Sequence, residues 1–258
     1  MARVTVDNVD KIFPPQQRGQ LPVQALKGVS FTVEEAEFCC LLGHSGCGKT
    51  TLLNIMAGFE QVSGGSVELN GQPVGKPSWQ RTMVFQDYAL FPWLTVARNI
   101  AFGLELKGVS AADITRTVPQ QVELVGLQGF ESRLPHELSG GMRQRVAIAR
   151  ALAVDPEVAL FDEPFAALDA QNRALLQNEL VRISRQTRKT MILITHSIEE
   201  AIKLSDRIIV MTRRPGTVKA NLQVDLPRPR DEEDPAVIAL KKELRALIAD
   251  EMEPETAA

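Results

Sequence analysis

Three short apolar runs, each ending abruptly at polar residues, constrain the fold of this chain more than any other feature. Such runs are typical of strands covered on both faces, as in a parallel sheet flanked by helices. A helical pattern follows each run, and this alternation predicts an α/β fold with a doubly wound sheet and a ligand site at the carboxyl ends of the strands. The runs are 38–42, 158–161 and 191–194, and the helical patterns are 50–58, 170–187 and 198–204.

Other patterns divide the rest of the chain. Short alternating segments at 4–9, 28–34 and 65–70, with a turn signal at Asn70-Gly71, predict a small antiparallel sheet. Residues 88–154 carry little strand signal and predict a helical insertion, with helices at 96–105, 111–125 and 141–153. Apolar spacing over 235–251 predicts an amphipathic helix, docked on the core or touching a partner. We expect a core of 1–87 and 155–227, a helical subdomain of 88–154 and a tail of 228–258.

Composition bounds the class of protein. With 258 residues and 44% hydrophobic residues, the chain is long and apolar enough for a sizeable buried core. Its 29 basic and 32 acidic side chains give a formal net charge of -3, which argues against a nucleic-acid partner. Three clustered cysteines do not make a disulfide framework and suit a reducing compartment. We expect neither an export signal nor a spanning helix, so any membrane role requires a separate spanning partner.

Residues 43–50 match the phosphate-loop pattern at each defined position, between an expected strand and an expected helix. The glycines let backbone N–H groups turn inward around phosphates, Lys49 supplies a positive charge, and Thr50 offers its hydroxyl to Mg²⁺. The alternative is a glycine-rich turn without a ligand. The expected nucleotide-binding residues here are Gly43, His44, Ser45, Gly46, Cys47, Gly48, Lys49, Thr50 and Thr51.

An acidic pair, Asp162-Glu163, ends the second apolar run. The first carboxylate can hold Mg²⁺ through water, and the second can orient or deprotonate a water that attacks the γ-phosphate. The alternative is a plain turn at Asp162-Glu163-Pro164. The presence of a phosphate loop in the same chain makes this alternative less favoured. Together the two elements predict a nucleotide hydrolase.

A second anion site is predicted where Ser139, Gly140 and Gly141 open a long amphipathic helix. Two phosphate cradles in one chain call for an explanation, because a nucleotide has one triphosphate. Residues 138–144, Leu-Ser-Gly-Gly-Met-Arg-Gln, resemble the signature of the ATP-binding-cassette (ABC) ATPases, and the resemblance extends over nearly the whole chain.

This resemblance implies a P-loop NTPase fold with a RecA-like parallel sheet core and the reaction of ATP with water to give ADP and phosphate. It further implies two copies paired head to tail, the signature residues Ser139, Gly140, Gly141 and Gln144 of each closing on the γ-phosphate held by the other. Gln86 resembles the family's glutamine that touches Mg²⁺, and residues 167–169, which include Asp169, resemble the loop that crosses the dimer interface. Residues implied as catalytic are Glu163, His196, Lys49 and Gln86, and those implied to hold Mg²⁺ are Thr50, Gln86 and Asp162.

His196 resembles the histidine that contacts the γ-phosphate and steadies Glu163, and its place at a strand's carboxyl end favours this role over a structural one. Phe13 stands where the family stacks an aromatic ring on adenine, although a core position is the alternative. The chain departs from the family at Ser197, where an acidic residue is common, and at His44, where proline is common.

Short strings at 91–96, 214–216 and 227–230 resemble the branch of nitrate, sulfonate, taurine and bicarbonate importers. That branch implies transmembrane permease subunits, an indirect link to a solute-binding protein, and a peripheral place on the cytoplasmic face of the inner membrane. The aromatic-rich residues 88–95 form either an interface with the permease or the core of the helical insertion. A soluble ABC ATPase of the repair or translation type is the alternative function, but the chain lacks a long coiled coil and a second cassette. A GTP switch is disfavoured because no Asn-Lys-x-Asp string occurs.

Overall fold

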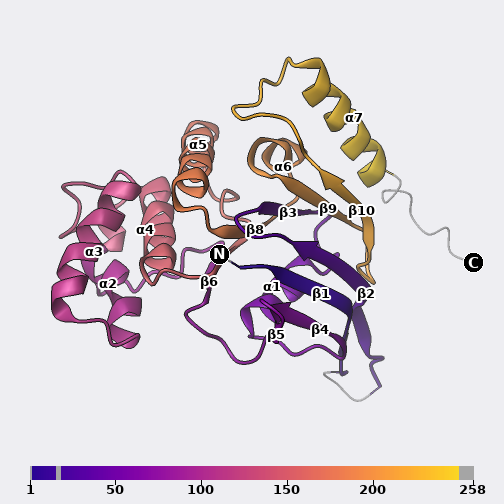
Figure 1. The fold of residues 1–258 in the computed structure, drawn as a ribbon, viewed down its shortest axis with the longest axis horizontal. Helices are drawn as coiled ribbons and strands as arrows, with labels where there is room; N and C mark the ends of the chain where they lie inside the picture. Colours follow the sequence, from indigo (N-terminus) through magenta and orange to yellow (C-terminus); the bar gives the residue numbers. More distant parts are fainter. Residues whose placement is uncertain (1, 16–18, 250–258) are drawn as a thin grey trace, which may run out of the picture. The chain divides into compact units, whose positions relative to one another are not determined.

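The structure is a computed structural model that describes residues 2–15 and 19–249 (Figure 1). Its residues form two compact units, with a boundary inside one strand. The phosphate-loop unit comprises residues 2–76 and 192–249, and the helical unit comprises residues 77–191. The finer division expected from the sequence, with a subdomain of 88–154, stays a prediction.

A small antiparallel sheet in the phosphate-loop unit has the strand order β2-β1-β4-β5. Val4 and Val6 of β1 are buried, because alternate side chains of a strand point to the same face, and a register shift between Val6 and Val9 lets Val9 be buried as well. The predicted sheet is therefore confirmed, although β1 and β2 are longer than expected and β5 was not predicted. The strands are β1 (Val4–Phe13), β2 (Val23–Val33), β4 (Gly64–Leu69) and β5 (Gln72–Pro73).

The expected buried strands are also present. In the phosphate-loop unit, neighbouring strands follow the order β10-β9-β3-β8. Every residue of β3 is buried, and β3 is parallel to β9 whereas β10 is antiparallel to it, so the sheet is mixed rather than wholly parallel. Helices α1 and α6 follow β3 and β8, as predicted. The elements are β3 (Phe38–Leu42), α1 (Lys49–Ala57), β8 (Thr190–Thr195), α6 (Ile198–Leu204), β9 (Arg207–Met211) and β10 (Val218–Gln223).

The helical unit contains the predicted insertion. Figure 1 shows α2, α3 and α4 grouped together, and the three helices contact one another. Two parallel strands, β6 and β7, flank the insertion in the chain, and β6 was not predicted. The elements are β6 (Arg81–Val84), α2 (Val96–Leu106), α3 (Ala111–Leu124), the 3-10 turn η1 (Pro135–Glu137), α4 (Gly140–Ala153), β7 (Val158–Asp162) and α5 (Ala170–Thr187).

The predicted C-terminal helix, α7 (Pro235–Ala249), packs against α6. Val237 and Leu244 are buried, and Lys241 pairs with Glu199 of α6 at 2.7 Å. The helix is thus docked on α6 within the phosphate-loop unit. The last two residues of the expected range, 250–251, lie outside the described residues. None of the helices in the part of the chain that the structure describes is long and apolar enough to cross a membrane.

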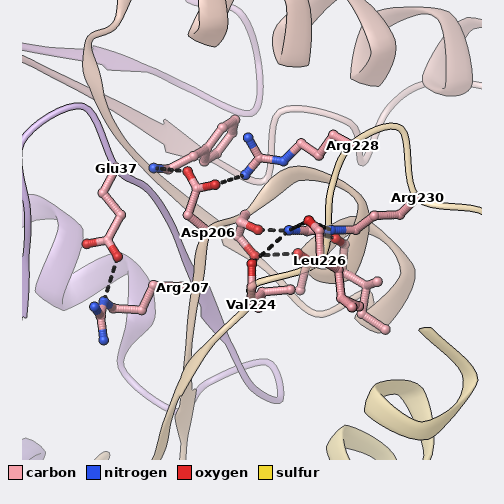
Figure 2. Close-up of polar contacts among 11 residues, drawn as sticks. Glu37, Asp206, Arg207, Val224, Leu226, Arg228 and Arg230 are labelled. Carbon is pink, nitrogen blue, oxygen red and sulfur yellow. Dashed lines mark hydrogen bonds and ion pairs between the residues drawn. The ribbon is translucent and has the colours of Figure 1, made fainter. Parts of the chain in front are cut away.

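Arginines tie the segment that leads to α7 onto the phosphate-loop unit (Figure 2). Asp206 accepts hydrogen bonds from the Phe38 N–H at 2.9 Å and from Arg228 at 2.6 Å. The guanidinium of Arg230 donates to four backbone carbonyls: those of Ile202 and Ser205 at the end of α6, and those of Val224 and Leu226 after β10. Because the last carbonyls of a helix have no intrahelical donor, Arg230 caps α6 and fastens the following segment to it.

We expect Arg230→Met to lower the free energy of unfolding by about 2 to 3 kcal/mol, because four carbonyls lose a charged donor while the apolar stem is kept. Thermal and denaturant unfolding of the full chain measure the change. Arg3→Met is the matched control. Arg3 is exposed, and its Nε makes only a long ion pair of 3.6 Å with the Glu34 carboxylate, so this substitution should change stability by less than about 0.5 kcal/mol. Equal losses in the two variants would contradict the capping role of Arg230.

Candidate functional site

The loop between β3 and α1 has a backbone that only glycine accommodates at Gly48. Gly48 has φ +99°, in the left-handed region that favours glycine. A Cβ atom there would also lie 2.7 Å from Leu26 and 2.9 Å from the Ala25 carbonyl. The start of α1 therefore packs directly against β2, which leaves its first backbone N–H groups at the carboxyl end of β3.

Lys49 is buried inside this loop, with a relative exposure of 4%. Its ammonium donates to the carbonyls of Gly43 at 2.7 Å and His44 at 2.8 Å, and lies 3.7 Å from the Cys47 sulfur. These bonds connect the first turn of α1 to the beginning of the loop. A positive charge is thereby held at the centre of the loop in a fixed position, which is the arrangement that phosphate oxygens require.

Exposure differs among the remaining residues of the loop. Ser45, Gly46 and Thr50 are exposed, whereas Cys47 is buried. The ring of His44 is half-buried, and its Nε2 lies 3.4 Å from the carbonyl of Ile248 in α7. The next helical residue, Thr51, is half-buried. The exposed groups therefore form the face of the loop that a ligand can reach.

The two other cysteines lie in β3 and are fully buried. Burial raises the pKa of the Cys39 thiol and that of the Cys40 thiol well above the ordinary value for cysteine. Because the thiolate is the reactive form, neither sulfur is suited to redox or nucleophilic chemistry at neutral pH.

A second loop, residues 212–217, packs against the phosphate loop from the end of β9. The Gly216 N–H donates to the Ala25 carbonyl at 2.9 Å, and the Lys27 N–H donates to the Gly216 carbonyl at 3.0 Å. A Cβ atom on Gly216 would lie 2.1 Å from the Cys47 carbonyl, so a glycine is required for this close approach. The position was not predicted as functional, although the Pro215-Gly216 dipeptide is a turn signal in the sequence.

His196 follows β8 directly in the phosphate-loop unit, and its side chain is exposed. The turn that carries it is fixed by the Thr195 hydroxyl, which donates to the buried Glu200 carboxylate at 2.6 Å and accepts from the Ser197 N–H at 3.0 Å. Ser197 also caps α6 by accepting from the Glu200 N–H. Serine thus has a structural role at the position where the family commonly has an acidic residue.

Phe13 is the last residue of β1 and is half-buried. The Lys11 ammonium lies 4.8 Å from its ring centroid and pairs with Glu60 at 2.7 Å. A partly accessible aromatic face at a strand end is compatible with stacking on a base, so the adenine contact of Phe13 stays a prediction.

In the helical unit, Asp162 ends β7 and Glu163 follows it, both half-buried. Glu163 has φ +42°, a conformation that is uncommon for residues other than glycine, asparagine and aspartate. Such outliers cost of order 1 kcal/mol or more and persist where the surrounding structure enforces them, frequently at functional sites. The backbone therefore turns sharply at the residue predicted to activate water.

The signature residues form the start of α4. Ser139 is the exposed N-cap, and its hydroxyl accepts from the Met142 N–H at 3.3 Å. A Cβ atom on Gly140 would lie 3.3 Å from the Tyr88 hydroxyl, so the helix start is closely packed. Gln144 is fully buried, and neither of its amide atoms has a hydrogen-bond partner among the described residues. Its predicted nucleotide contact is not tested by this placement and stays a prediction.

Asn172 links the signature to the loop that contains Asp169. Asp169 is the exposed N-cap of α5, and its carboxylate accepts from the Asn172 N–H at 3.0 Å and from the Asn172 side chain at 2.7 Å. These bonds lower the pKa of Asp169, so it stays anionic at neutral pH. The same asparagine lies against Gly141, 3.5 Å from where a Cβ atom would be. Asn172 was not predicted, because an asparagine in the first turn of a helix has no distinctive pattern.

Gln86 is exposed just after β6, and the backbone beyond it is held by α4. Tyr88 and Ala89 both have positive φ, and their carbonyls accept from Arg150 at 3.1 and 2.7 Å. Burial lowers the pKa of Arg150. The predicted site residues divide between the two units. The helical unit contains Gln86, Ser139, Asp162, Glu163 and Asp169, and the other unit contains the phosphate loop, His196 and Phe13.

Comparisons with known proteins agree with this chemistry. The family model described as "ABC transporter" matches residues 26–166, more than half of the chain. An uncharacterised ABC transporter ATP-binding protein of Methanocaldococcus jannaschii is 47% identical over 97% of this chain and 92% of its own length. An aliphatic sulfonates import ATP-binding protein of Bacillus cereus is 45% identical over 93% of this chain and 94% of its own length.

Further relatives carry related names, among them a nitrate import ATP-binding protein of Synechococcus elongatus, 44% identical over 92% of this chain and 88% of its own length. A solved dimeric structure of a post-hydrolysis state of an ATP-binding cassette, bound to ADP and Pi, is similar with a TM-score of 0.74 and 30% identity. It covers 87% of this chain and 100% of its own. The similarity bears out the expected P-loop NTPase fold.

We expect Gly216→Ala to displace the phosphate loop, because its Cβ atom would overlap the Cys47 carbonyl. The predicted result is an increase of roughly tenfold or more in the Kd for ATP and a lower thermal midpoint, since forced overpacking typically costs about 1 to 3 kcal/mol. Gly75→Ala is the control, because nothing lies within 4 Å of its Cβ position and its φ is ordinary. Unchanged ATP binding by Gly216→Ala would refute the close contact between the two loops.

Proposed function

Because the chain belongs to the ABC transporter family of ATP-binding proteins, we propose that residues 43–50 bind the phosphates of ATP in an ATP-hydrolysing subunit of an importer. The observation that carries the proposal is the buried Lys49, whose ammonium is held inside the loop by the carbonyls of Gly43 and His44. An unliganded structural lysine would not need the exposed donor-rich face that Ser45, Gly46 and Thr50 provide.

In the proposed reaction, a water molecule attacks the γ-phosphorus of ATP and the bond to the bridging β–γ oxygen breaks, giving ADP and phosphate. Glu163 orients this water and accepts its proton. Lys49 stabilises the negative charge on the β and γ oxygens, and His196 contacts the γ-phosphate from the turn after β8. Each of these three roles is a proposal for the residue named.

A bound Mg²⁺ would be held by the hydroxyl of Thr50, the amide oxygen of Gln86 and, through water, the carboxylate of Asp162. These donors are hard oxygen atoms, the ligands that Mg²⁺ prefers. No group of three His, Cys, Asp or Glu side chains among the described residues could hold a metal ion, and the proposed donor set accordingly relies on phosphate and water for the remaining positions. When bound, the ion neutralises charge on the phosphates.

Two copies acting together explain the second anion site. The exposed Ser139 hydroxyl and the N–H groups at the start of α4 provide donors for a γ-phosphate held by another copy. The similar solved cassette is a dimer, which supports a head-to-tail pair for this chain. Asp169 and Asn172 lie beside this helix start and would face the partner copy.

The importer assignment also requires a membrane partner, and residues 91–95 provide a surface for it. Asn99 is fully buried and holds this segment, accepting from the Phe91 N–H at 3.0 Å and donating to the carbonyls of Phe91, Leu94 and Thr95. Trp93 nevertheless has a relative exposure of 72%, which favours an interface over the core alternative at this residue. We assign this surface to a permease, and with it a peripheral place on the cytoplasmic face of the membrane.

The relatives' names extend the proposal to cargo. Import proteins for sulfonates and nitrate are among them, and a taurine import ATP-binding protein of Jannaschia sp. is 44% identical over 99% of this chain. The proposed cargo is therefore a small anion or organic compound of this kind, delivered by a solute-binding protein. These names do not support the alternative of a soluble ABC ATPase without a transport role.

We expect Glu163→Gln to reduce ATP hydrolysis by about a hundredfold or more, because the side chain keeps its size and loses its basicity. ATP should remain bound and hold two copies together, as measured by phosphate release, nucleotide retention and size-exclusion chromatography. The control is Glu123→Gln, an exposed carboxylate in α3 of the same unit, which should hydrolyse ATP at the normal rate. Normal hydrolysis by Glu163→Gln would remove Glu163 from the mechanism.

We expect Trp93→Ala to leave ATP hydrolysis by the isolated protein within twofold of normal and to reduce its assembly with the permease by roughly tenfold or more. Co-purification with the permease and permease-stimulated ATP hydrolysis measure the effect. Leu21→Ala removes another exposed apolar side chain, 83% exposed and in the other unit, and should assemble normally. Equal assembly of the two variants would place the permease surface elsewhere.

A further inference from the structure

Arg213 and Arg214 line one open hollow together with the first half of the phosphate loop. The hollow measures about 640 Å³, and its lining residues are His44, Ser45, Gly46, Cys47, Arg213 and Arg214. None of these described lining residues is acidic. Two guanidinium groups and a backbone loop rich in N–H donors thus border the same space, which is an environment for a polyanion.

The loop that carries the two arginines is held in one conformation by Thr212. The Thr212 N–H donates to the Thr217 carbonyl at 3.0 Å, and the Thr217 N–H donates back to the Thr212 hydroxyl at 2.9 Å. The same hydroxyl donates within the loop to the carbonyls of Arg213 and Pro215. The loop is therefore closed by hydrogen bonds of Thr212 and Thr217.

The position of this loop relative to the phosphate loop is also fixed. Gly216 forms a parallel bridge with Leu26 of β2, and Leu26 in turn lies where a Cβ atom on Gly48 would be. Gly216 itself lies directly against the Cys47 carbonyl. The distance between the arginine backbone and the phosphate loop therefore cannot vary much, and both Arg213 and Arg214 are exposed at the rim.

The positive charge of the two arginines complements the negative charge of a triphosphate. The triphosphate of ATP carries about four negative charges, and the phosphate loop contributes one buried ammonium that is also bonded to two carbonyls. Guanidinium groups present several N–H donors in a plane and suit phosphate oxygens better than any other side chain. Arg213 and Arg214 are exposed and line the same hollow as the phosphate loop, so they are placed to approach an anion bound there.

We propose that Arg213 and Arg214 are nucleotide-contacting residues that bind phosphate oxygens of the ATP held by residues 43–50. This inference rests on the proposed function, because it takes the phosphate loop as the ATP site. It adds two side chains to that site from a loop in which the sequence predicted no ligand-binding residue.

The test compares Arg213→Gln, Arg214→Gln and the double variant in the full chain, with ATP and ADP as separate ligands. The double variant should raise the Kd for ATP roughly tenfold, with smaller effects in the single variants, because exposed charged hydrogen bonds are weaker than buried ones. A loss confined to ATP assigns the contact to the γ-phosphate, and a similar loss for ADP assigns it to the other phosphates. Replacing both arginines by lysine should recover part of the affinity, because the charge returns without the planar set of donors.

Arg3→Gln is the matched control, an exposed arginine of the same unit outside the hollow, and it should bind ATP normally. Thermal unfolding verifies that the loop variants fold. Unchanged ATP and ADP affinity in the double variant, or an effect seen only on the association of two copies, would overturn the inference. Lys49→Ala separates the two claims: normal ATP binding by Lys49→Ala would instead overturn the proposed ATP site.

Discussion

The direct contact of backbone with backbone around the phosphate loop is the constraint on which the rest of the structure depends. Gly48 packs against Ala25 and Leu26 of β2, and Gly216 packs against Cys47 from the other side. Neither glycine has room for a side chain, because the Ala25 carbonyl lies 2.9 Å from the Cβ position of Gly48 and the Cys47 carbonyl lies 2.1 Å from that of Gly216. The ammonium of Lys49 then closes the loop from within. An anion cradle of this kind is set by packing before a ligand arrives, which lowers the entropy lost on binding.

The helical unit reaches a comparable rigidity by other means. Buried or half-buried polar side chains hold its irregular segments: Asn99 fixes residues 91–95, and Arg150 fixes the carbonyls of Tyr88 and Ala89. Because these segments have few backbone partners of their own, side chains satisfy their polar groups. The exposed Trp93 therefore lies in a segment whose backbone is already held by Asn99, and a partner that bound it would lose little entropy in ordering this segment.

Much of the architecture could be predicted from the sequence because the buried strands and their following helices carry strong, uninterrupted patterns. The bounds of α5 and α6 agree with the expected ranges, and the phosphate loop lies between β3 and α1 as its motif requires. Strands β5, β6, β9 and β10 were missed. Strands β5, β6 and β10 mix polar and apolar residues and are mostly not buried, whereas β9 is an apolar run like those that were predicted and was overlooked. The contact of Gly216 with the phosphate loop was also missed, because it joins segments more than 150 residues apart, which no local pattern reports. The same separation in sequence hides the hollow that Arg213 and Arg214 share with that loop. The assignments of Phe13 and Gln144 stay predictions, since side-chain burial alone does not decide a ligand contact.

The left-handed backbone at Glu163 sets the proposed catalytic role against local stability. At this conformation glycine or asparagine would relieve strain, so the backbone energetics favour a residue other than glutamate. The proposed water-activating carboxylate is therefore held at a cost in folding free energy, a trade-off expected where activity needs a strained residue.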